Sequence, residues 1–186
     1  MTSLEILRQL PSLFRYADVE KFTGNANVFL TRAQSKSLVE RIAGGVYLNA
    51  LREPVPGIEE IACFLRTPSY ISCEWALNRH GVLLQAPTVL TVLTLQTSVG
   101  PSRNVVTGDV TIEFSRIAPR LFTGFEAKEG YNLATPEKAL LDAIYLRKRV
   151  PFPDELDFDA IDRAKLARLA ESFPAVVRKR LEEVLQ

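Results

Sequence analysis

The first fifty residues alternate between short hydrophobic patterns and breaks, and the patterns predict helices. Apolar residues along one side of 3–9 predict a short helix that Pro11 ends or kinks. A second helix begins at 16–18 and closes at Gly24, because glycine readily adopts the left-handed conformation of a helix C-cap. A third helix follows almost at once. Two helices joined by a tight, glycine-containing connection are typical of a helix-turn-helix, although a plain three-helix cluster has the same pattern.

The stretch 25–47 contains the most informative pattern of the first fifty residues. Its apolar residues lie close enough to helical spacing to bury one face: Val28, Leu30, Ala33 and Leu38. Asn25 or Asn27 can cap the start of the helix with a side-chain oxygen. Beyond Leu38, apolar residues flank Gly44-Gly45, a pair that permits the positive φ of a tight hairpin turn. The pattern therefore predicts a polar-faced helix followed by a two-stranded hairpin.

A polar-faced helix followed by a hairpin is also how winged helix-turn-helix domains address DNA, with the helix in the major groove and basic residues on phosphates. Candidate DNA-binding residues lie on the polar face, at the foot of the hairpin and just past it. They are Asn27, Thr31, Arg32, Gln34, Lys36, Arg41 and Arg52. The alternative is a helix and hairpin of any small α/β domain with ordinary solvated side chains, and Arg41 and Arg52 are explained equally well as surface charges.

A turn-rich break at 53–57 marks the predicted domain boundary. Pro54 and Pro56, followed by Gly57, stop a helix or a central strand. We therefore expect a winged helix-turn-helix domain over residues 1–56 and a second domain over 57–186, with a helix at 58–66 as connector.

The second domain is predicted to combine strands and helices. Ser72 can cap a helix that Gly81 ends, and two strands follow at 88–95 and 109–117, with a possible third at 121–125. The helix at 135–146 is the clearest in the chain. Its predicted cap is Thr135, and Lys138 and Asp142 can form an i,i+4 pair worth roughly a few tenths of a kcal/mol. Two last helices, broken near Pro174, complete the fold prediction.

The expected fold class is α+β: an N-terminal winged helix-turn-helix domain, then a mixed α/β domain with a small sheet packed by helices. The net charge of the 186 residues is +1, and residues 1–56 hold seven Lys/Arg against five Asp/Glu. Because phosphate neutralisation supplies much of DNA affinity, a monomer is expected to bind weakly. Tight binding then needs two or more copies on a repeated or inverted site.

Composition also excludes some classes of protein. The sequence contains no apolar run of 18 residues and no basic, then apolar, N-terminal signal, so we expect a cytoplasmic protein without a membrane partner. Cys63, Cys73 and the single His80 match no metal-ligand spacing. We therefore expect neither a metal nor a cofactor.

Two patterns suggest catalysis, but each has a simpler explanation. Glu126-Ala127-Lys128 matches the Glu-x-Lys of metal-dependent nucleases, with Asp109 or Glu113 as a second carboxylate, yet it lies beside a predicted surface turn. His80 near Cys73 or Ser72 suggests a nucleophile. A helix cap explains Ser72, and a position near a helix C-terminus explains His80, whose N–H can bond a free carbonyl there. We therefore predict that the protein is not an enzyme.

Several segments together resemble the AbiEi-type antitoxins of type IV toxin–antitoxin systems, which are linked to abortive infection. They are Tyr70-Ile71-Ser72, Ala76-Leu77, His80-Gly81, the Thr-rich strand 88–94 and the stretch Ala134–Asp142. The segment 40–47 resembles the winged helix-turn-helix of that family. The resemblance covers roughly residues 5–150, and the order of four motifs carries it.

The resemblance implies a DNA-binding transcriptional regulator that represses its own operon. Its expected partners are the inverted repeats of its own promoter and, functionally if not by stable contact, a nucleotidyltransferase-like toxin encoded next door. The alternative is a protein-interaction module that binds a partner protein through the winged helix and the C-terminal domain, without sequence-specific DNA binding. The mild net charge favours that alternative.

Overall fold

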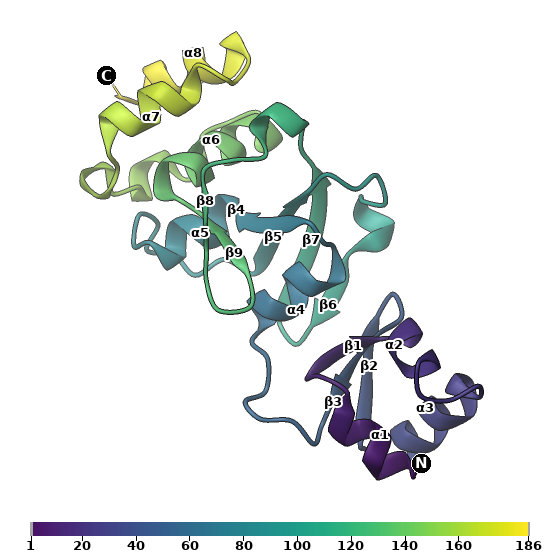
Figure 1. The fold of residues 1–186 in the computed structure, drawn as a ribbon. Helices are drawn as coiled ribbons and strands as arrows, with labels where there is room; N and C mark the ends of the chain where they lie inside the picture. The colour runs from purple at the N-terminus through teal and green to yellow at the C-terminus, as the bar shows by residue number, and fades with distance from the viewer. Residues whose placement is uncertain (1, 186) are drawn as a thin grey trace. The chain divides into compact units, whose positions relative to one another are not determined.

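The computed structural model describes residues 2–185 and is α+β (Figure 1). The chain forms two compact units, Met1–Leu65 and Arg66–Gln186. The division lies nine residues beyond the boundary predicted at residue 56. The proline-rich break is a loop inside the first unit, because the helix that follows it is held there: the Arg15 guanidinium donates to the Phe64 carbonyl at 2.6 Å.

The first unit contains four helices and a three-stranded antiparallel sheet with strand order β1-β3-β2. Its elements are α1 (Ser3–Gln9), β1 (Leu13–Arg15), α2 (Tyr16–Glu20), α3 (Ala26–Ser35), β2 (Val39–Ala43), β3 (Val46–Asn49) and α4 (Ile58–Leu65). The starts of two helices have a local cause. Thr2 and Glu5 form a reciprocal capping box at α1, and Asp18 accepts from the Arg15 N–H at 2.8 Å at the start of α2.

One hydrophobic core holds the helices of the first unit to its sheet. It is built from residues of α1, α2, α3 and the strands: Ile6, Leu7, Leu10, Phe14, Val19, Ala26, Phe29, Leu30, Ala33, Val39 and Tyr47. Phe14 of β1 stacks on Tyr47 of β3 with ring centroids 5.6 Å apart. Leu38, which the hydrophobic pattern placed on the third helix, lies beyond its end, since Ser37 turns the chain at φ 55.

The second unit is a six-stranded mixed sheet with strand order β6-β7-β5-β4-β9-β8. Its strands are β4 (Ser69–Ser72), β5 (Val89–Thr94), β6 (Val105–Thr107), β7 (Val110–Arg116), β8 (Phe125–Ala127) and β9 (Asn132–Ala134). The strands predicted at 88–95 and 109–117 are β5 and β7, which pair in parallel. The strand predicted at 121–125 is wrong: a 3-10 helix at Pro119–Leu121 precedes β8.

Four helices complete the second unit: α5 (Cys73–Arg79), α6 (Pro136–Arg147), α7 (Arg163–Ala170) and α8 (Ala175–Leu185). Helices α5 and α6 contact each other and the sheet, and α7 and α8 pack on α6 (Figure 1). Helix α6 is therefore enclosed, and eight of its twelve residues are buried. Among the described residues, no helix is both long and apolar enough to cross a membrane.

Candidate nucleic-acid interface

Helix α3 has two contrasting sides. Four apolar side chains cluster on one side and are buried in the core: Ala26, Phe29, Leu30 and Ala33. Because successive residues turn by about 100° around a helix, the remaining positions share the opposite arc. Asn27, Thr31, Arg32 and Gln34 lie on that arc and are exposed. The helix contains no carboxylate.

The capping prediction for this helix is wrong in its detail. Asn25 does occupy the N-cap position, but its side chain makes no capping hydrogen bond. Asn27 lies inside the first turn and is exposed. The loop is instead pinned through Thr23, whose hydroxyl accepts from the Asn25 N–H at 3.2 Å. Asn27 therefore has no structural task at this end of the helix.

The predicted hairpin consists of β2 and β3, joined at Gly44 and Gly45. Their φ angles are 53° and 75°, the left-handed values that a tight turn of this kind requires and that glycine adopts without strain. The Tyr16 N–H donates to the Gly45 carbonyl at 3.1 Å, which ties the turn to the start of α2. Arg41 of β2 is exposed and lies opposite Tyr47 of β3.

The predicted DNA-binding residues separate into two groups. Arg32, Lys36 and Arg41, together with Asn27, Thr31 and Gln34, are exposed, and their side chains make no hydrogen bond or ion pair among the residues that the structure describes. Arg52 belongs elsewhere. It is half-buried, its Nε donates to the Leu10 carbonyl at 2.9 Å, and its Nη2 donates to the Arg8 carbonyl. Arg52 thus binds the C-terminal carbonyls of α1.

The second unit corrects three sequence predictions, two of them through a buried polar network. Lys138 and Asp142 are an ion pair with side chains only 1% and 0% exposed, not a weak surface pair. Ser72 makes no hydrogen bond that caps α5, and its hydroxyl donates to Asp142 Oδ2 at 2.7 Å. Thr135 stands at the N-cap position of α6 but makes no capping bond.

Tyr70 is the fourth member of this network, and its buried ring helps to shield the network from solvent. Its hydroxyl donates to Asp142 Oδ2 at 3.0 Å and accepts from Lys138 Nζ at 2.7 Å. Burial, with Asp142 beside it, raises the pKa of Tyr70, so the hydroxyl stays protonated and can donate. The ring is stacked on Phe125 at 4.7 Å. The four polar groups are therefore buried and bind one another.

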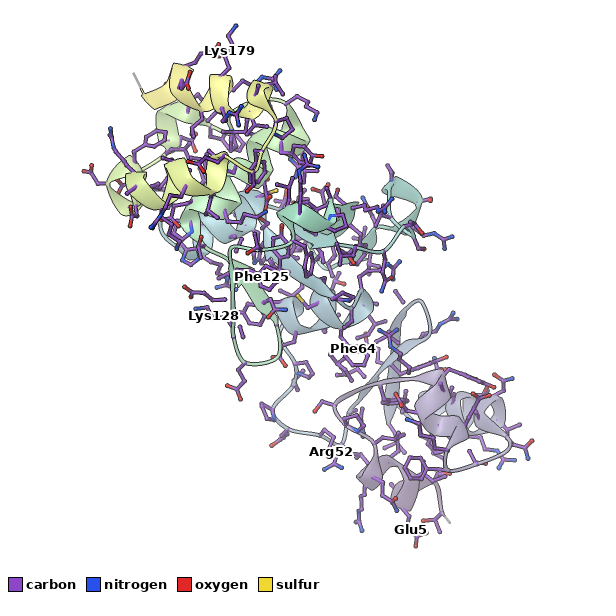
Figure 2. The ribbon with its side chains drawn as sticks, turned by 45° about the horizontal axis from the view of Figure 1, so that its top comes forward. Glu5, Arg52, Phe64, Phe125, Lys128 and Lys179 are labelled. Atoms are coloured by element: carbon purple, nitrogen blue, oxygen red, sulfur yellow. The ribbon has the colours of Figure 1, made fainter. Side chains whose placement is uncertain are left out.

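The residues of the suspected nuclease pattern do not converge. Glu126 lies on β8 and pairs with Lys128 at 3.0 Å on the surface, near the loop that joins β8 to β9 (Figure 2). Glu113 lies on β7, and three strands separate β7 from β8. Four inter-strand spacings amount to about 19 Å, too far for two ligands of one metal ion. Within residues 2–185, no group of three His, Cys, Asp or Glu side chains is placed to hold a metal.

The other suspected catalytic residues are also explained by packing. The ring of His80 follows α5, and its Nε2 lies 2.8 Å from the Ala134 carbonyl at the end of β9. Cys73 is buried, and burial raises the pKa of its thiol well above the ordinary value. A protonated, enclosed thiol is a poor nucleophile.

Comparison with known proteins supports the fold alone. No protein-family model and no curated protein matches the chain. Among solved structures, the crystal structure of the RV2827C protein from Mycobacterium tuberculosis is similar, with a TM-score of 0.62 and 12% sequence identity. The match covers 98% of this chain and 74% of that one. The described α+β architecture therefore recurs in a protein of very different sequence.

Proposed function

We propose that the first unit is a winged helix-turn-helix that binds double-stranded DNA, with α3 as the recognition helix and the β2–β3 hairpin as the wing. The element order α1-β1-α2-α3-β2-β3 and the sheet order β1-β3-β2 support this assignment. Helix α3 packs on the core through its apolar side, so its polar side is exposed. The major groove of B-DNA is wide enough to admit an α-helix.

The observation that carries the proposal is the set of exposed polar side chains that have no partner within the described part of the chain. Three of them are cations: Arg32, Lys36 and Arg41. Asn27 and Gln34 offer amides of the kind that read adenine, and Arg32 offers the fork that reads guanine or holds a phosphate. The lack of any carboxylate on α3 removes a source of repulsion from phosphates.

The charge of the first unit sets the expected mode of binding. Over residues 1–65 the sequence has seven Lys/Arg and seven Asp/Glu, so there is no strong basic field. A single copy is then expected to bind weakly, and two copies on an inverted repeat give useful affinity. This matches a regulator that acts on its own promoter.

The experiment is a titration of the full-length protein with its own upstream DNA over a salt series, using an unrelated fragment for comparison. We expect Arg32→Ala, Lys36→Ala and Arg41→Ala to weaken specific binding, and a lost phosphate contact to lower the salt slope by about 1. Asn27→Ala or Gln34→Ala should cost about 1–3 kcal/mol and relax sequence preference. Lys179→Ala, an exposed cation of α8, is the matched control (Figure 2). If all three cation variants bind like the control, the assigned surface is wrong.

We further propose that the protein is an antitoxin of the AbiEi type, which represses its own operon and counteracts a nucleotidyltransferase-like toxin. The resemblance of the motifs between Tyr70 and Asp142 supports this part of the proposal. The test is growth of cells that express the neighbouring toxin gene, with and without this protein. Rescue by the Arg32→Ala variant would separate antitoxicity from DNA binding, whereas failure of the unaltered protein to rescue would refute the antitoxin role.

A second candidate function is a protein-interaction module that uses the same surface. It is favoured by the balanced charge of the first unit and by Val28, an apolar residue of α3 that is 47% exposed. It predicts co-purification with the neighbouring gene product and no salt-sensitive DNA binding. Val28→Lys separates the two functions, because it should weaken a protein interface and leave or increase DNA affinity.

A further inference from the structure

A cavity of about 400 Å³ lies in the second unit, and none of the residues assigned to DNA lines it. Its walls come from the start of α5, the loop before β5, the middle of β7 and the region after α6. Leu83, Val89 and Phe152 form apolar walls, while Glu74, Glu113 and Arg147 provide charge. Volumes of a few hundred Å³ with a mostly apolar lining and a few convergent polar groups are typical of small-molecule sites.

The charged end of the cavity is organised around Arg147, the last residue of α6. Its Nε and Nη2 donate to the two carboxylate oxygens of Glu74 at 3.2 and 3.3 Å, and Nη2 also donates to Glu113 Oε1 at 2.5 Å. Burial alone lowers the pKa of Arg147, but these hydrogen bonds outweigh burial and hold the pKa above its ordinary value. The guanidinium is therefore fixed in place and permanently charged.

Two carboxylates surround this one guanidinium, so the charged lining has a net charge of −1. Glu113 Oε1 is already used, since it accepts from Arg147 and from Thr91 Oγ1 at 2.8 Å. Its other oxygen, Oε2, makes no hydrogen bond to any residue in 2–185, and the side chain is 21% exposed. The lining thus includes a carboxylate with one oxygen unpaired among the described residues, and it carries excess negative charge. Both favour a ligand that carries positive charge.

Backbone strain is concentrated at the same place. The described residues include four non-glycine residues with positive φ. Phe152 lines the cavity, and two others are next in sequence to lining residues: Cys73 precedes Glu74 and Lys148 follows Arg147. Each such conformation costs on the order of 1–3 kcal/mol and clusters at functional sites in other proteins. Phe152 is 45% exposed, which gives the site an accessible aromatic ring of the kind that cations contact face-on.

We propose that this cavity binds an organic cation with an apolar stem, that is, an alkyl-guanidinium or alkyl-ammonium group. The head pairs with Glu113 Oε2, and the stem packs against Leu83, Val89 and Phe152. An anion is disfavoured because two carboxylates repel it and because the Arg147 guanidinium already donates to those carboxylates. The cation can be a free small amine or the side chain of Arg or Lys on a partner protein. The proposal is independent of DNA binding.

The experiment is calorimetric titration of the full-length protein at low salt, with agmatine in one arm and a peptide with one internal arginine in the other. Glu113→Gln removes the open acceptor and the excess charge, and should weaken binding about tenfold or more. Ala86→Trp blocks the cavity from an exposed position and leaves the charges intact. Glu129→Gln, an exposed carboxylate elsewhere, is the matched control.

The outcomes are distinct. Binding of either probe that is lost in Glu113→Gln and Ala86→Trp but kept in Glu129→Gln supports the site, and the tighter probe identifies the source of the cation. The proposal is overturned if neither probe binds at millimolar concentration, if both cavity variants bind like the control, or if citrate binds in their place. Should Glu113→Gln fail to fold, Ala86→Trp still decides the question.

Discussion

The buried pair of Lys138 and Asp142 gives the sharpest prediction about stability. Asp142→Asn keeps the shape of the side chain but removes its charge, so the ammonium of Lys138 is left buried without its counter-ion. The pair is enclosed on all sides, with side chains 1% and 0% exposed. Breaking one partner of such a pair costs about 3–5 kcal/mol, because an uncompensated charge remains in a medium of low dielectric constant.

The same geometry predicts that a second substitution rescues the first. Lys138→Met together with Asp142→Asn removes both charges, while the Asn carbonyl can still accept from the hydroxyls of Tyr70 and Ser72, which now donate to Asp142 at 3.0 and 2.7 Å. Replacing both members of a buried pair by neutral groups of similar volume is often neutral or stabilising. We therefore expect the double variant to be more stable than Asp142→Asn alone by about 2 kcal/mol or more.

Urea unfolding, followed by circular dichroism, measures these differences. With a slope of about 1–3 kcal/mol per molar urea, a loss of 3–5 kcal/mol moves the midpoint by roughly 1–5 M. The total stability of a domain of this size is about 5–15 kcal/mol, so the single variant should be visibly marginal. If the two substitutions are additive to within about 0.5 kcal/mol, the side chains are not coupled and the reasoning is refuted.

The pH dependence of Asp142→Asn provides an independent check. Burial lowers the pKa of Lys138, and the carboxylate of Asp142 opposes that effect. Without the carboxylate, the folded pKa falls further below the unfolded value, and the unfolded chain then binds more protons. Stability should rise with pH across the interval between those two pKa values. The unaltered protein should rise less over the same interval, and equal slopes for the two proteins would contradict the assignment.

Three further predictions follow from single contacts. Gly124→Ala should destabilise the second unit by about 1–3 kcal/mol in the same urea assay, because φ is +78° and the new Cβ would lie 3.0 Å from Lys138 Cγ. Glu137 Oε2 forms an ion pair with Lys165 Nζ at 3.0 Å; burial raises the pKa of Glu137, yet the interaction with Lys165 and the hydrogen bond from the Asp162 N–H leave that pKa below its ordinary value. Stability from Glu137 is therefore present above pH 4.5 and lost as pH falls through the lowered pKa, and Glu137→Gln should flatten that part of an acid titration. Arg52→Ala should cost about 1–2 kcal/mol of stability in the first unit, whereas Arg41→Ala should stay within about 0.5 kcal/mol.

Much of the first unit could be predicted because its elements are encoded locally. Helical spacing of apolar residues identified α1, α2 and α3, and the pair Gly44-Gly45 identified the hairpin turn. The strand β1 was missed because three residues, Leu13–Arg15, are too short to show alternation. The strands β8 and β9 were missed for the same reason.

The polar network of the second unit could not be predicted, because its contacts join distant parts of the chain. The spacing of Lys138 and Asp142 is the same for an exposed pair and a buried one. Burial depends on Tyr70 of β4, which lies 72 residues from Asp142, and on the packing of α7 and α8 over α6. A Ser before a helix is usually a cap. At Ser72 the hydroxyl instead donates a charge-assisted hydrogen bond to the buried carboxylate of Asp142, and it makes no cap hydrogen bond.

The cations of the first unit show why the candidate interface is confined to α3 and the hairpin. Three of the seven already bind within the unit: Arg15 to the Phe64 carbonyl, Lys21 to Asp18, and Arg52 to the end of α1. The side chains of the other four make no hydrogen bond or ion pair among residues 2–185, and three of these belong to α3, its C-cap and β2: Arg32, Lys36 and Arg41. A cation that already has a partner within its own unit would have to lose that contact to bind a phosphate. A cation without a partner gains a charge-assisted hydrogen bond when it binds one. The net charge of the unit therefore bears on the affinity expected of one copy, whereas the distribution of unpaired cations predicts which surface DNA contacts under the proposed function.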